Sequence, residues 1–214
     1  MHRIFILSPA STNGKRAAIL MSDRADFDLA RRLRSRDGAP LWEVFSFLSG
    51  LYFRGKFTYS KHFGRAPDDV AAQYVITSDA GLMNCDESVS LERLKDFGQV
   101  PIDLLEPRYT RPLRESVNSL ELSLPANCDV VLLGSIATNK YTDLLIQSFG
   151  ERLRFPREFI GRGDLSRGGL LLRAVKADSE LEYVALTAAE SRRGPRPPKL
   201  PKETIAVDRI PFIP

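Results

Sequence analysis

The sequence is poor in the residues that build metal sites, disulfide scaffolds and histidine-dependent catalytic sites. It contains two cysteines, Cys85 and Cys128, and two histidines, His2 and His62, among 214 residues. There is no CxxC spacing, so neither a zinc site nor a disulfide framework is favoured. Two histidines, one of them beside the terminus, also give no basis for a Ser-His-Asp or Cys-His arrangement. We therefore expect no metal and no cofactor.

Long apolar runs are also missing. No stretch reaches the roughly 20 apolar residues of a transmembrane helix, and the apolar part of the opening segment is too short for a secretory signal. We therefore expect a cytoplasmic protein that has no membrane partner. The composition, with 43% hydrophobic and 27% charged residues, is typical of a folded globular protein. The length suits one α/β domain over residues 1–214.

Positive charge is concentrated near the C-terminus. The chain has 31 lysines and arginines against 27 acidic residues, and residues 192–202, RRGPRPPKLPK, hold five of these cations and no acid. We call residues 192–202 the basic strap. Its prolines favour an extended segment, and its cations are suited to follow a phosphate backbone. Arg192, Arg193, Arg196 and Lys199 are therefore candidate contacts to a DNA backbone.

Apolar runs that end in polar loops predict a three-layer α/β fold, with a mostly parallel sheet flanked by helices. Strands are expected over residues 3–8, 71–78 and 130–133. Helices are expected over residues 23–36, 41–63 (two helices divided by glycine), 90–97, 112–123 and 138–149, with residues 102–113 largely extended. Residues 169–177 and 181–188 have strand composition and predict a C-terminal hairpin before the basic strap, and residues 205–210 an edge strand after it.

Three polar loops, after Leu7, Thr77 and Leu133, meet at one edge of the sheet if their strands are parallel. The last of them, GSIATNKY at 134–141, can offer backbone N–H groups at a helix start to a phosphate or a base carbonyl. It lacks the spacing of a P-loop. The alternative is a helix cap with a surface lysine. The candidate ligand-binding residues are Ser8, Gly134, Ser135, Asn139 and Tyr141.

The segment FIGRGDLSRGG at 159–169 predicts a glycine-rich loop that can approach a phosphate chain. Arg162 and Arg167 supply forked donors for phosphate oxygens, with Ser166 between them. The alternative is a solvated loop in which Asp164 pairs with an arginine.

Basic and aromatic residues interleave in LYFRGKFTYSKHF at 51–63. Aromatic faces can stack on bases while Arg54 and Lys56 follow the DNA backbone. An aromatic stripe at helical spacing is, however, more often part of a core.

Three side chains are candidates for catalysis. Asp79 follows a predicted strand, where a carboxylate can activate water or stabilise positive charge on a sugar as a glycosidic bond breaks. Asp164 offers the same chemistry. Lys140 can attack the sugar if its amine is neutral. The alternative for Asp79 is an Asx-type turn.

Several segments, taken in order, resemble a known group of proteins. RIFILSPAST resembles the opening strand and loop of the YaaA-type peroxide-stress proteins, YVITSDAGLM resembles their strand with a YGLL motif, and EPRYTRPL resembles the segment after it. The string from VVLLGSIATNKY to FIGRGDLSRGGLLLR is similar to a widely spread bacterial family without assigned activity. The resemblance covers most of residues 3–173. It implies an α/β core like that of uracil-DNA-glycosylase-like proteins, and the handling of nucleobases or DNA.

The sequence also departs from these relatives. Ala80-Gly81 replaces the tyrosine-glycine pair of YGLL, and the GQDPYH and HPSPL motifs of ordinary uracil-DNA glycosylases are missing. Uracil specificity is therefore not implied. The function expected is a DNA glycosylase-like enzyme that excises a modified nucleobase from DNA, in repair or anti-phage defence. The alternatives are a non-catalytic DNA-binding stress protein and an enzyme acting on free nucleotides or nucleosides.

Overall fold

The computed structural model describes residues 2–187 and 194–200. In this part of the chain six strands form one sheet in the order β4–β3–β1–β6–β7–β8, and two short strands, β2 and β5, pair separately. The strands are β1 (Arg3–Leu7), β2 (Ala39–Pro40), β3 (Gln73–Ile76), β4 (Leu82–Asn84), β5 (Ser88–Val89), β6 (Asp129–Leu133), β7 (Leu153–Pro156) and β8 (Tyr183–Ala185). The helices are α1 (Lys15–Met21), α2 (Asp28–Arg34), α3 (Leu41–Ser49), α4 (Leu51–Phe63), α5 (Leu91–Phe97), α6 (Pro107–Ser123), α7 (Asn139–Phe149) and α8 (Asp164–Lys176).

The centre of the six-stranded sheet is parallel. β3, β1, β6 and β7 run in one direction, and Leu7 lies beside Val75 on one side and Leu133 on the other. β4 and β8 are antiparallel edge strands. The carboxyl ends of β1, β3 and β6 therefore meet at one edge of the sheet, and the loops that follow them lie there, as the sequence predicted.

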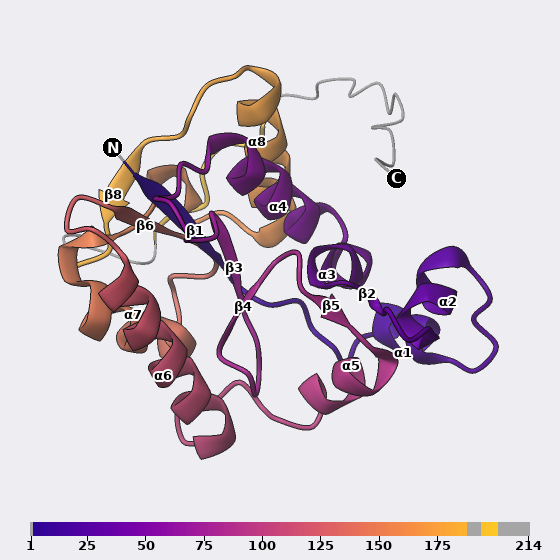
Figure 1. The fold of residues 1–214 in the computed structure, drawn as a ribbon. Coiled ribbons are helices and arrows are strands. Elements are labelled where there is room, and N and C mark those ends of the chain that lie inside the picture. The colour runs from indigo at the N-terminus through magenta and orange to yellow at the C-terminus, as the bar shows by residue number, and fades with distance from the viewer. Residues whose placement is uncertain (1, 188–193, 201–214) are drawn as a thin grey trace.

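Helices cover both faces of the sheet. Figure 1 shows α4 and α8 on one side and α6 and α7 on the other, while α1, α2 and α5 gather beyond the carboxyl end of β1. All five residues of β6 are buried, because both of its faces are covered. The apolar run VVLL thus has the composition of a strand that is shielded from water on both sides. The α/β class and the mostly parallel sheet are confirmed.

Helices α4 and α8 pack unusually closely, through two glycines. A Cβ atom at Gly55 would lie 2.8 Å from the carbonyl oxygen of Gly168, and one at Gly168 would lie 2.9 Å from the Cα atom of Tyr52. Both distances are shorter than real Cβ contacts allow. Glycine is therefore required at both positions for the two helix backbones to touch.

Several helix predictions are confirmed. Gly50 has a φ of 64° and separates α3 from α4, so residues 41–63 form two helices, although Gly55 lies inside the second one. Ser90 caps α5, since its Oγ atom accepts a hydrogen bond from the Arg93 backbone N–H at 3.1 Å. α7 ends at Gly150, as expected.

Other predictions are wrong. Residues 169–177, expected as a hairpin strand, belong mainly to α8, and β8 pairs with β7 instead. The second half of the expected loop at 159–169 is also helical, because α8 begins at Asp164. Residues 107–112, expected to be extended, begin α6, where Pro107 takes the first helical position and needs no N–H partner.

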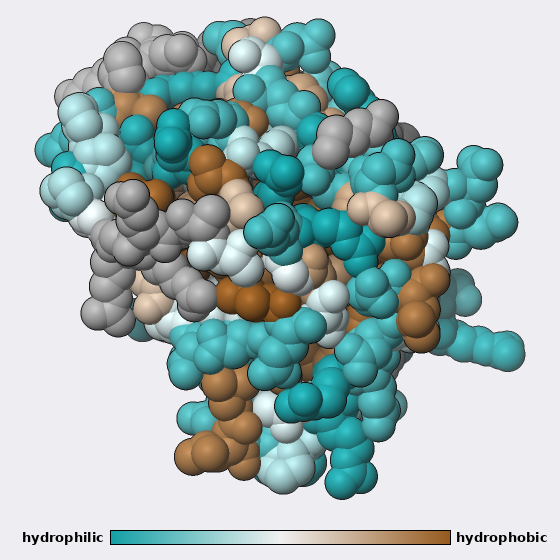
Figure 2. Space-filling model, turned by 90° about the vertical axis from the view of Figure 1, so that its left-hand side faces the viewer, coloured by the Kyte–Doolittle hydropathy of each residue, from teal (hydrophilic) through white to brown (hydrophobic). Residues whose placement is uncertain are grey.

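The remaining C-terminal expectations divide between described and undescribed residues. The described part of the basic strap, residues 194–200, contains no helix or strand. The expected strand at 205–210, Arg192 and Arg193 lie outside the described residues. No helix in the described part of the chain combines the length and apolar character that crossing a bilayer requires. The face turned to the viewer in Figure 2 is largely hydrophilic, with separate hydrophobic patches.

Candidate functional site

A cavity of about 460 Å³ lies at the carboxyl edge of the sheet, where the loops after β1 and β3 meet the start of α7. Its wall carries hydroxyl, amide, carboxyl and amine groups together with two phenylalanines. The lining residues are Pro9, Ala10, Ser11, Thr12, Asn13, Phe45, Ser78, Phe97, Val100, Pro101, Ile102, Asp103 and Lys140.

Hydrogen bonds between loops hold the cavity wall in place. The Asn13 side-chain amide donates to the Gly98 carbonyl at 3.3 Å, and the Ser78 hydroxyl donates to the Phe97 carbonyl at 2.7 Å. Phe45 meets Phe97 edge to face, with ring centroids 6.2 Å apart. The end of α5 thus ties the loops that follow β1 and β3 to an aromatic floor.

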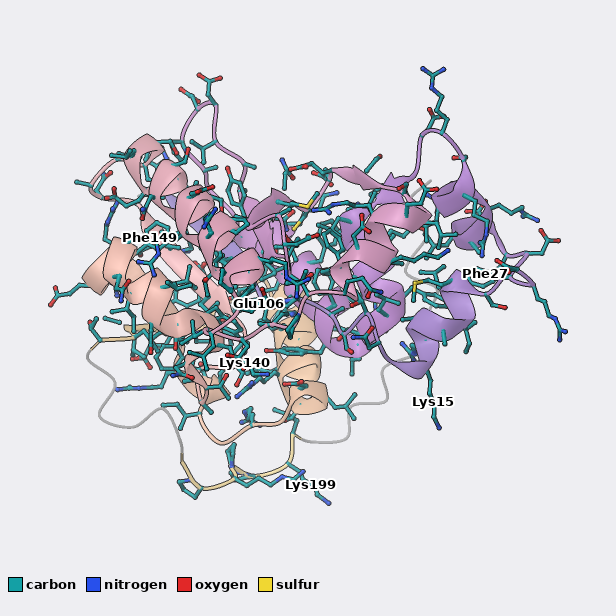
Figure 3. All side chains as sticks on the ribbon, turned by 90° about the horizontal axis from the view of Figure 1, so that it is seen from below. Lys15, Phe27, Glu106, Lys140, Phe149 and Lys199 are labelled. Carbon is teal, nitrogen blue, oxygen red and sulfur yellow. The ribbon has the colours of Figure 1, made fainter. Side chains whose placement is uncertain are left out.

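Lys140 reaches the cavity from the first turn of α7. The Tyr109 hydroxyl of α6 donates to its backbone carbonyl at 3.0 Å, so this turn is anchored to the neighbouring helix. Figure 3 shows Lys140 near the middle of the molecule and Lys199, on the described part of the basic strap, at its lower rim. Of the three candidate catalytic residues, Lys140 is the one that lines the cavity.

The two carboxylates expected to be catalytic lie elsewhere. Both oxygens of Asp79 accept hydrogen bonds from the Arg93 guanidinium, at 2.8 and 2.9 Å, which fixes the turn after β3 to α5. The Asp164 side chain is 69% exposed at the start of α8 and pairs with Arg167 at 3.5 Å. The carboxylate that does line the cavity in the described part of the chain is Asp103, one oxygen of which accepts from the Leu105 N–H at 2.9 Å.

A buried group of side chains lies beside the cavity, and we call it the Lys56 cluster: Ser8, Tyr52, Lys56, Tyr141 and Arg167. They come from the end of β1 and from α4, α7 and α8, and each is at most 8% exposed. Lys56 Nζ donates to the Ser8 carbonyl at 2.6 Å and contacts Ser8 Oγ at 2.9 Å. Its amine also lies 4.6 Å from the centre of the Tyr52 ring.

Burial sets the ionisation of this cluster. It lowers the pKa of the Lys56 amine to about 7, against the opposing fields of Asp164 and Cys85, and the Arg167 charge adds to the lowering. Burial also raises the pKa of the Tyr141 phenol to about 12. Lys56 is therefore a lysine with a large neutral fraction near physiological pH, next to a hydroxyl group.

Gly134, which directly follows β6, lies against two members of the Lys56 cluster, Ser8 and Tyr141. A Cβ atom at this position would lie 2.8 Å from the Tyr141 hydroxyl and 2.9 Å from Ser8 Cβ. The Tyr141 hydroxyl donates to the Ser135 carbonyl at 2.9 Å. The structure thus brings together Ser8, Gly134, Ser135 and Tyr141, four of the five candidate ligand-binding residues at the ends of β1 and β6. The fifth, Asn139, is exposed at the start of α7.

The expected phosphate-binding arginines behave differently from one another. Arg167 is buried, and its Nε and Nη2 atoms donate to the Phe159 carbonyl at 3.3 and 3.0 Å. Arg162 Nη1 donates to Ser166 Oγ at 3.3 Å and to the Pro198 carbonyl at 3.4 Å, so it links α8 to the basic strap.

A second cavity, of about 220 Å³, lies between the start of α8 and the strap. Its lining residues are Arg162, Gly163, Leu165, Ser166, Arg196, Pro197, Pro198, Lys199 and Leu200.

Of the two residues of α4 that were expected to contact a DNA backbone, Arg54 and Lys56, the prediction for Lys56 is wrong. Lys56 is 1% exposed and its amine is held inside the fold, so it cannot reach a phosphate backbone outside the protein in this conformation. Arg54 is exposed on the same helix. Helix α4 is buried around most of its circumference, and an alternation of lysine with aromatic residues does not reveal that in the sequence.

Comparison of the chain with protein-family models, with curated proteins and with solved structures gives no match. Among residues 2–187 and 194–200, no group of three or more His, Cys, Asp or Glu side chains is placed to hold a metal ion. Cys85 and Cys128 are buried free thiols. Function is therefore inferred from the two cavities and the Lys56 cluster.

Proposed function

We propose that the protein binds DNA and hydrolyses the bond between a modified nucleobase and its sugar. One observation carries this proposal: a cavity at the carboxyl edge of the sheet holds an amine, Lys140, and a carboxylate, Asp103, in its wall. Its volume of about 460 Å³ lies in the range of roughly 300–1,000 Å³ that is usual for small-molecule sites. A flipped nucleotide is a ligand of that size, and Phe45 and Phe97 offer an apolar floor for a base.

The reaction assigns a role to each of the two groups. Asp103 accepts a proton from a water molecule as its oxygen attacks C1′ of the sugar. The bond from C1′ to the base nitrogen breaks, and the Lys140 ammonium gives a proton to the leaving base. Negative charge on Asp103 also stabilises the positive charge that develops on the sugar ring. The products are the free base and a sugar that carries the hydroxyl group.

The second cavity supports DNA as the substrate. Arg162, Arg196 and Lys199 line it; Arg162 lies in the turn before α8, and the other two lie in the basic strap. Arg162 Nε is buried and makes no hydrogen bond with the described residues. Cations grouped in this way suit the oxygens of a DNA phosphate. We further propose that the sheet and its carboxyl-edge site are arranged as in uracil-DNA-glycosylase-like proteins.

The experiment is the release of bases from modified DNA. Purified protein is incubated with single- and double-stranded DNAs that carry different base modifications, and free bases are measured by mass spectrometry. We expect one class of base to be released, and release to fall about 100-fold or more in Asp103→Asn and in Lys140→Ala, the usual contribution of a general acid or base. Lys15→Ala, an exposed lysine of α1, is the matched control and should behave like the parent.

Two results would replace the proposal with a defined alternative. DNA that is bound without release of any base would indicate a non-catalytic DNA-binding protein. Cleavage of free nucleosides or nucleotides, with none of DNA, would make the basic strap irrelevant to the reaction. A covalent adduct trapped by borohydride and absent in Lys140→Ala would show that the Lys140 amine, instead of water, attacks the sugar.

A further inference from the structure

Lys56 is a buried lysine whose partner is a hydroxyl group instead of a carboxylate. Its Nζ atom contacts both oxygens of Ser8, and it makes no salt bridge with any residue that the structure describes. A buried ammonium without a counter-charge is costly, so the site favours the neutral amine. A neutral amine can accept a proton, which a structural lysine on the surface does not do near neutral pH.

The Ser8 hydroxyl lies where it can donate its proton to the Lys56 amine. The distance of 2.9 Å between Ser8 Oγ and Lys56 Nζ is within the reach of a nucleophile and its general base. Ser8 directly follows β1, the strand at the centre of the parallel sheet, and the next two residues, Pro9 and Ala10, line the large cavity. Open α/β sheets place their reactive groups at this edge.

The surroundings hold both groups in one geometry. The Ser8 carbonyl accepts a second bond from Nζ, and the rings of Tyr52 and Phe53 lie 4.6 and 4.8 Å from the amine. On the other side, the lack of a side chain at Gly134 leaves room for Ser8 and Tyr141. The pair is therefore preorganised by its neighbours, as an activated nucleophile requires.

We infer that Ser8 is a nucleophile activated by Lys56 as its general base, and that the substrate class of this pair is a carboxylic ester or thioester. This activity is distinct from base excision and uses neither Asp103 nor Lys140. An acyl substrate is favoured over a phosphoryl one, because the Lys56 cluster offers phosphate oxygens no cation free for them: Lys56 reacts as the neutral amine and Arg167 is held by the Phe159 carbonyl.

The reaction proceeds in two balanced steps. As Ser8 Oγ attacks the acyl carbon, its proton passes to Lys56 Nζ, and the alcohol or thiol leaves with that proton. Water then attacks the acyl group on Ser8, gives one proton to Lys56, and releases the carboxylic acid while the Lys56 ammonium returns the proton to Ser8 Oγ. No oxidant, metal or further reactant takes part.

The pH dependence follows from the charges around Lys56. Asp164 and Arg167 act on it from α8 and Cys85 from the turn after β4, while the Tyr141 phenol of α7 stays protonated in the neutral range. With the pKa of Lys56 near 7, the neutral amine and the reaction rate should both rise with pH around that value.

The test is covalent labelling of the full-length protein with a fluorophosphonate, a probe that reacts with activated serine hydroxyls. We expect a single adduct, mapped by mass spectrometry to Ser8, and a labelling rate that increases about 10-fold from pH 6 to pH 8. A p-nitrophenyl ester should give a burst of one nitrophenol for each protein molecule. Ser8→Ala should abolish both signals, and Lys56→Met should slow labelling about 100-fold or more.

The control variant is Ser119→Ala, which removes an exposed hydroxyl of α6 and should label like the parent. An adduct on another residue, no adduct, or an unchanged rate in a folded Lys56→Met protein would overturn the inference and leave Lys56 as an anchor for the Ser8 carbonyl. If Lys56→Met does not fold, the pH profile of the parent decides the question, because a rate that does not change between pH 6 and pH 8 excludes Lys56 as the base. Base release from DNA is measured separately, so that failure of either activity can be distinguished from failure of the other.

Discussion

The charged and ionisable groups at the amino ends of strands β1 and β6 differ from those at the carboxyl ends in the partners they contact. At the amino end, Arg3 pairs with Glu180, and Asp129 accepts a hydrogen bond from Arg154 Nε at 2.8 Å. At the carboxyl end, Lys56 is more deeply buried than these residues, yet its contacts are the oxygens of Ser8. Ion pairs thus lie at the amino ends of β1 and β6, whereas at the carboxyl end of β1 the Lys56 amine of α4 contacts Ser8 and makes no salt bridge with a described residue.

This difference separates groups that stabilise the fold from groups suited to chemistry. In a matched pair that is partly open to water, each charge has an opposite charge beside it. A buried amine without a counter-charge weakens the folded state, and proteins tolerate such groups mainly where function needs a shifted pKa. The carboxyl end of the sheet is thus the end that we propose to be reactive, and four changes test this contrast.

The largest effect is expected from Lys56→Met and should depend on pH. The folded pKa of Lys56, about 7, is below that of an unfolded lysine, so the unfolded chain binds more protons between these two values. The penalty for burying the amine is complete below pH 7 and disappears as the pH rises towards 10. The free energy of unfolding of the parent should therefore rise relative to Lys56→Met, by on the order of 3 kcal/mol from pH 7 to pH 10. Urea unfolding at several pH values measures this.

The matched control for this change is Lys176→Met, an exposed lysine at the end of α8. Its pH dependence should follow that of the parent. If Lys56→Met and the parent change with pH in parallel, then Lys56 carries its charge throughout the range and the contrast between the two ends of the sheet disappears.

Gly134→Val should give the next largest effect, a decrease in stability. Its Cβ atom would meet the Tyr141 hydroxyl and Ser8 Cβ at 2.8 and 2.9 Å, and overpacking of this kind typically costs about 1–3 kcal/mol. The variant should also fail to label at Ser8. Gly14→Ala is the control, since a Cβ atom there meets nothing within 4 Å. The melting temperatures of the two variants are measured. Equal melting temperatures would show that Ser8 and Tyr141 can move aside for the valine side chain at little cost.

Arg154→Met tests the amino end. The Asp129 side chain is 10% exposed, so removal of Arg154 leaves a nearly buried carboxylate without its partner, which should cost about 1–2 kcal/mol. Arg157→Met removes a pair of similar length, 3.0 Å to Glu182, whose side chains are 62% and 58% exposed. That change should cost at most about 0.5 kcal/mol. Chemical denaturation measures both changes. Equal destabilisation of the two variants would show that the less exposed Arg154–Asp129 pair contributes no more than the exposed Arg157–Glu182 pair.

The smallest effect on stability belongs to the strap. Arg196 and Lys199 are exposed, so replacing both by alanine should leave unfolding unchanged. DNA binding should weaken, and the slope of log K against log salt should become shallower by about 0.9 for each phosphate that the variant no longer neutralises. Fluorescence anisotropy titrations at several salt concentrations measure this. The same slope in parent and variant would place the DNA, if bound, elsewhere on the protein.

The strands at the centre of the sheet could be predicted because their apolar runs are short, continuous and closed by polar loops. Residues 169–177 misled the prediction, since three leucines in succession are as compatible with a buried strand as with a helix. In the structure these residues belong mainly to α8, in which Gly168 packs against the backbone of α4, a tertiary contact that no local pattern contains. Pro107 and Pro112 likewise favour an extended segment in isolation, yet both lie in α6.

The candidate site was predicted in its position more than in its chemistry. The loops after β1, β3 and β6 do meet, and Ser8, Gly134 and Lys140 lie there. Asp103 was missed because it follows no predicted strand. Lys56 was interpreted as a surface cation because lysine is rarely buried. Its burial depends on helices that come from distant parts of the sequence, so the lowered pKa has no local signal.

The glycine contact between α4 and α8 has a consequence for two buried basic side chains. Gly55 precedes Lys56 and Gly168 follows Arg167, so each basic residue is attached one residue from the point where the helix backbones touch. The spacing between the two attachment points is thus set by contacts between main-chain atoms. A side chain at either glycine would push the two helices apart and shift Lys56 relative to Arg167. A substitution at Gly55 or Gly168 can therefore change the proton affinity of Lys56 without replacing any side chain of the Lys56 cluster, because the Arg167 charge contributes to that affinity.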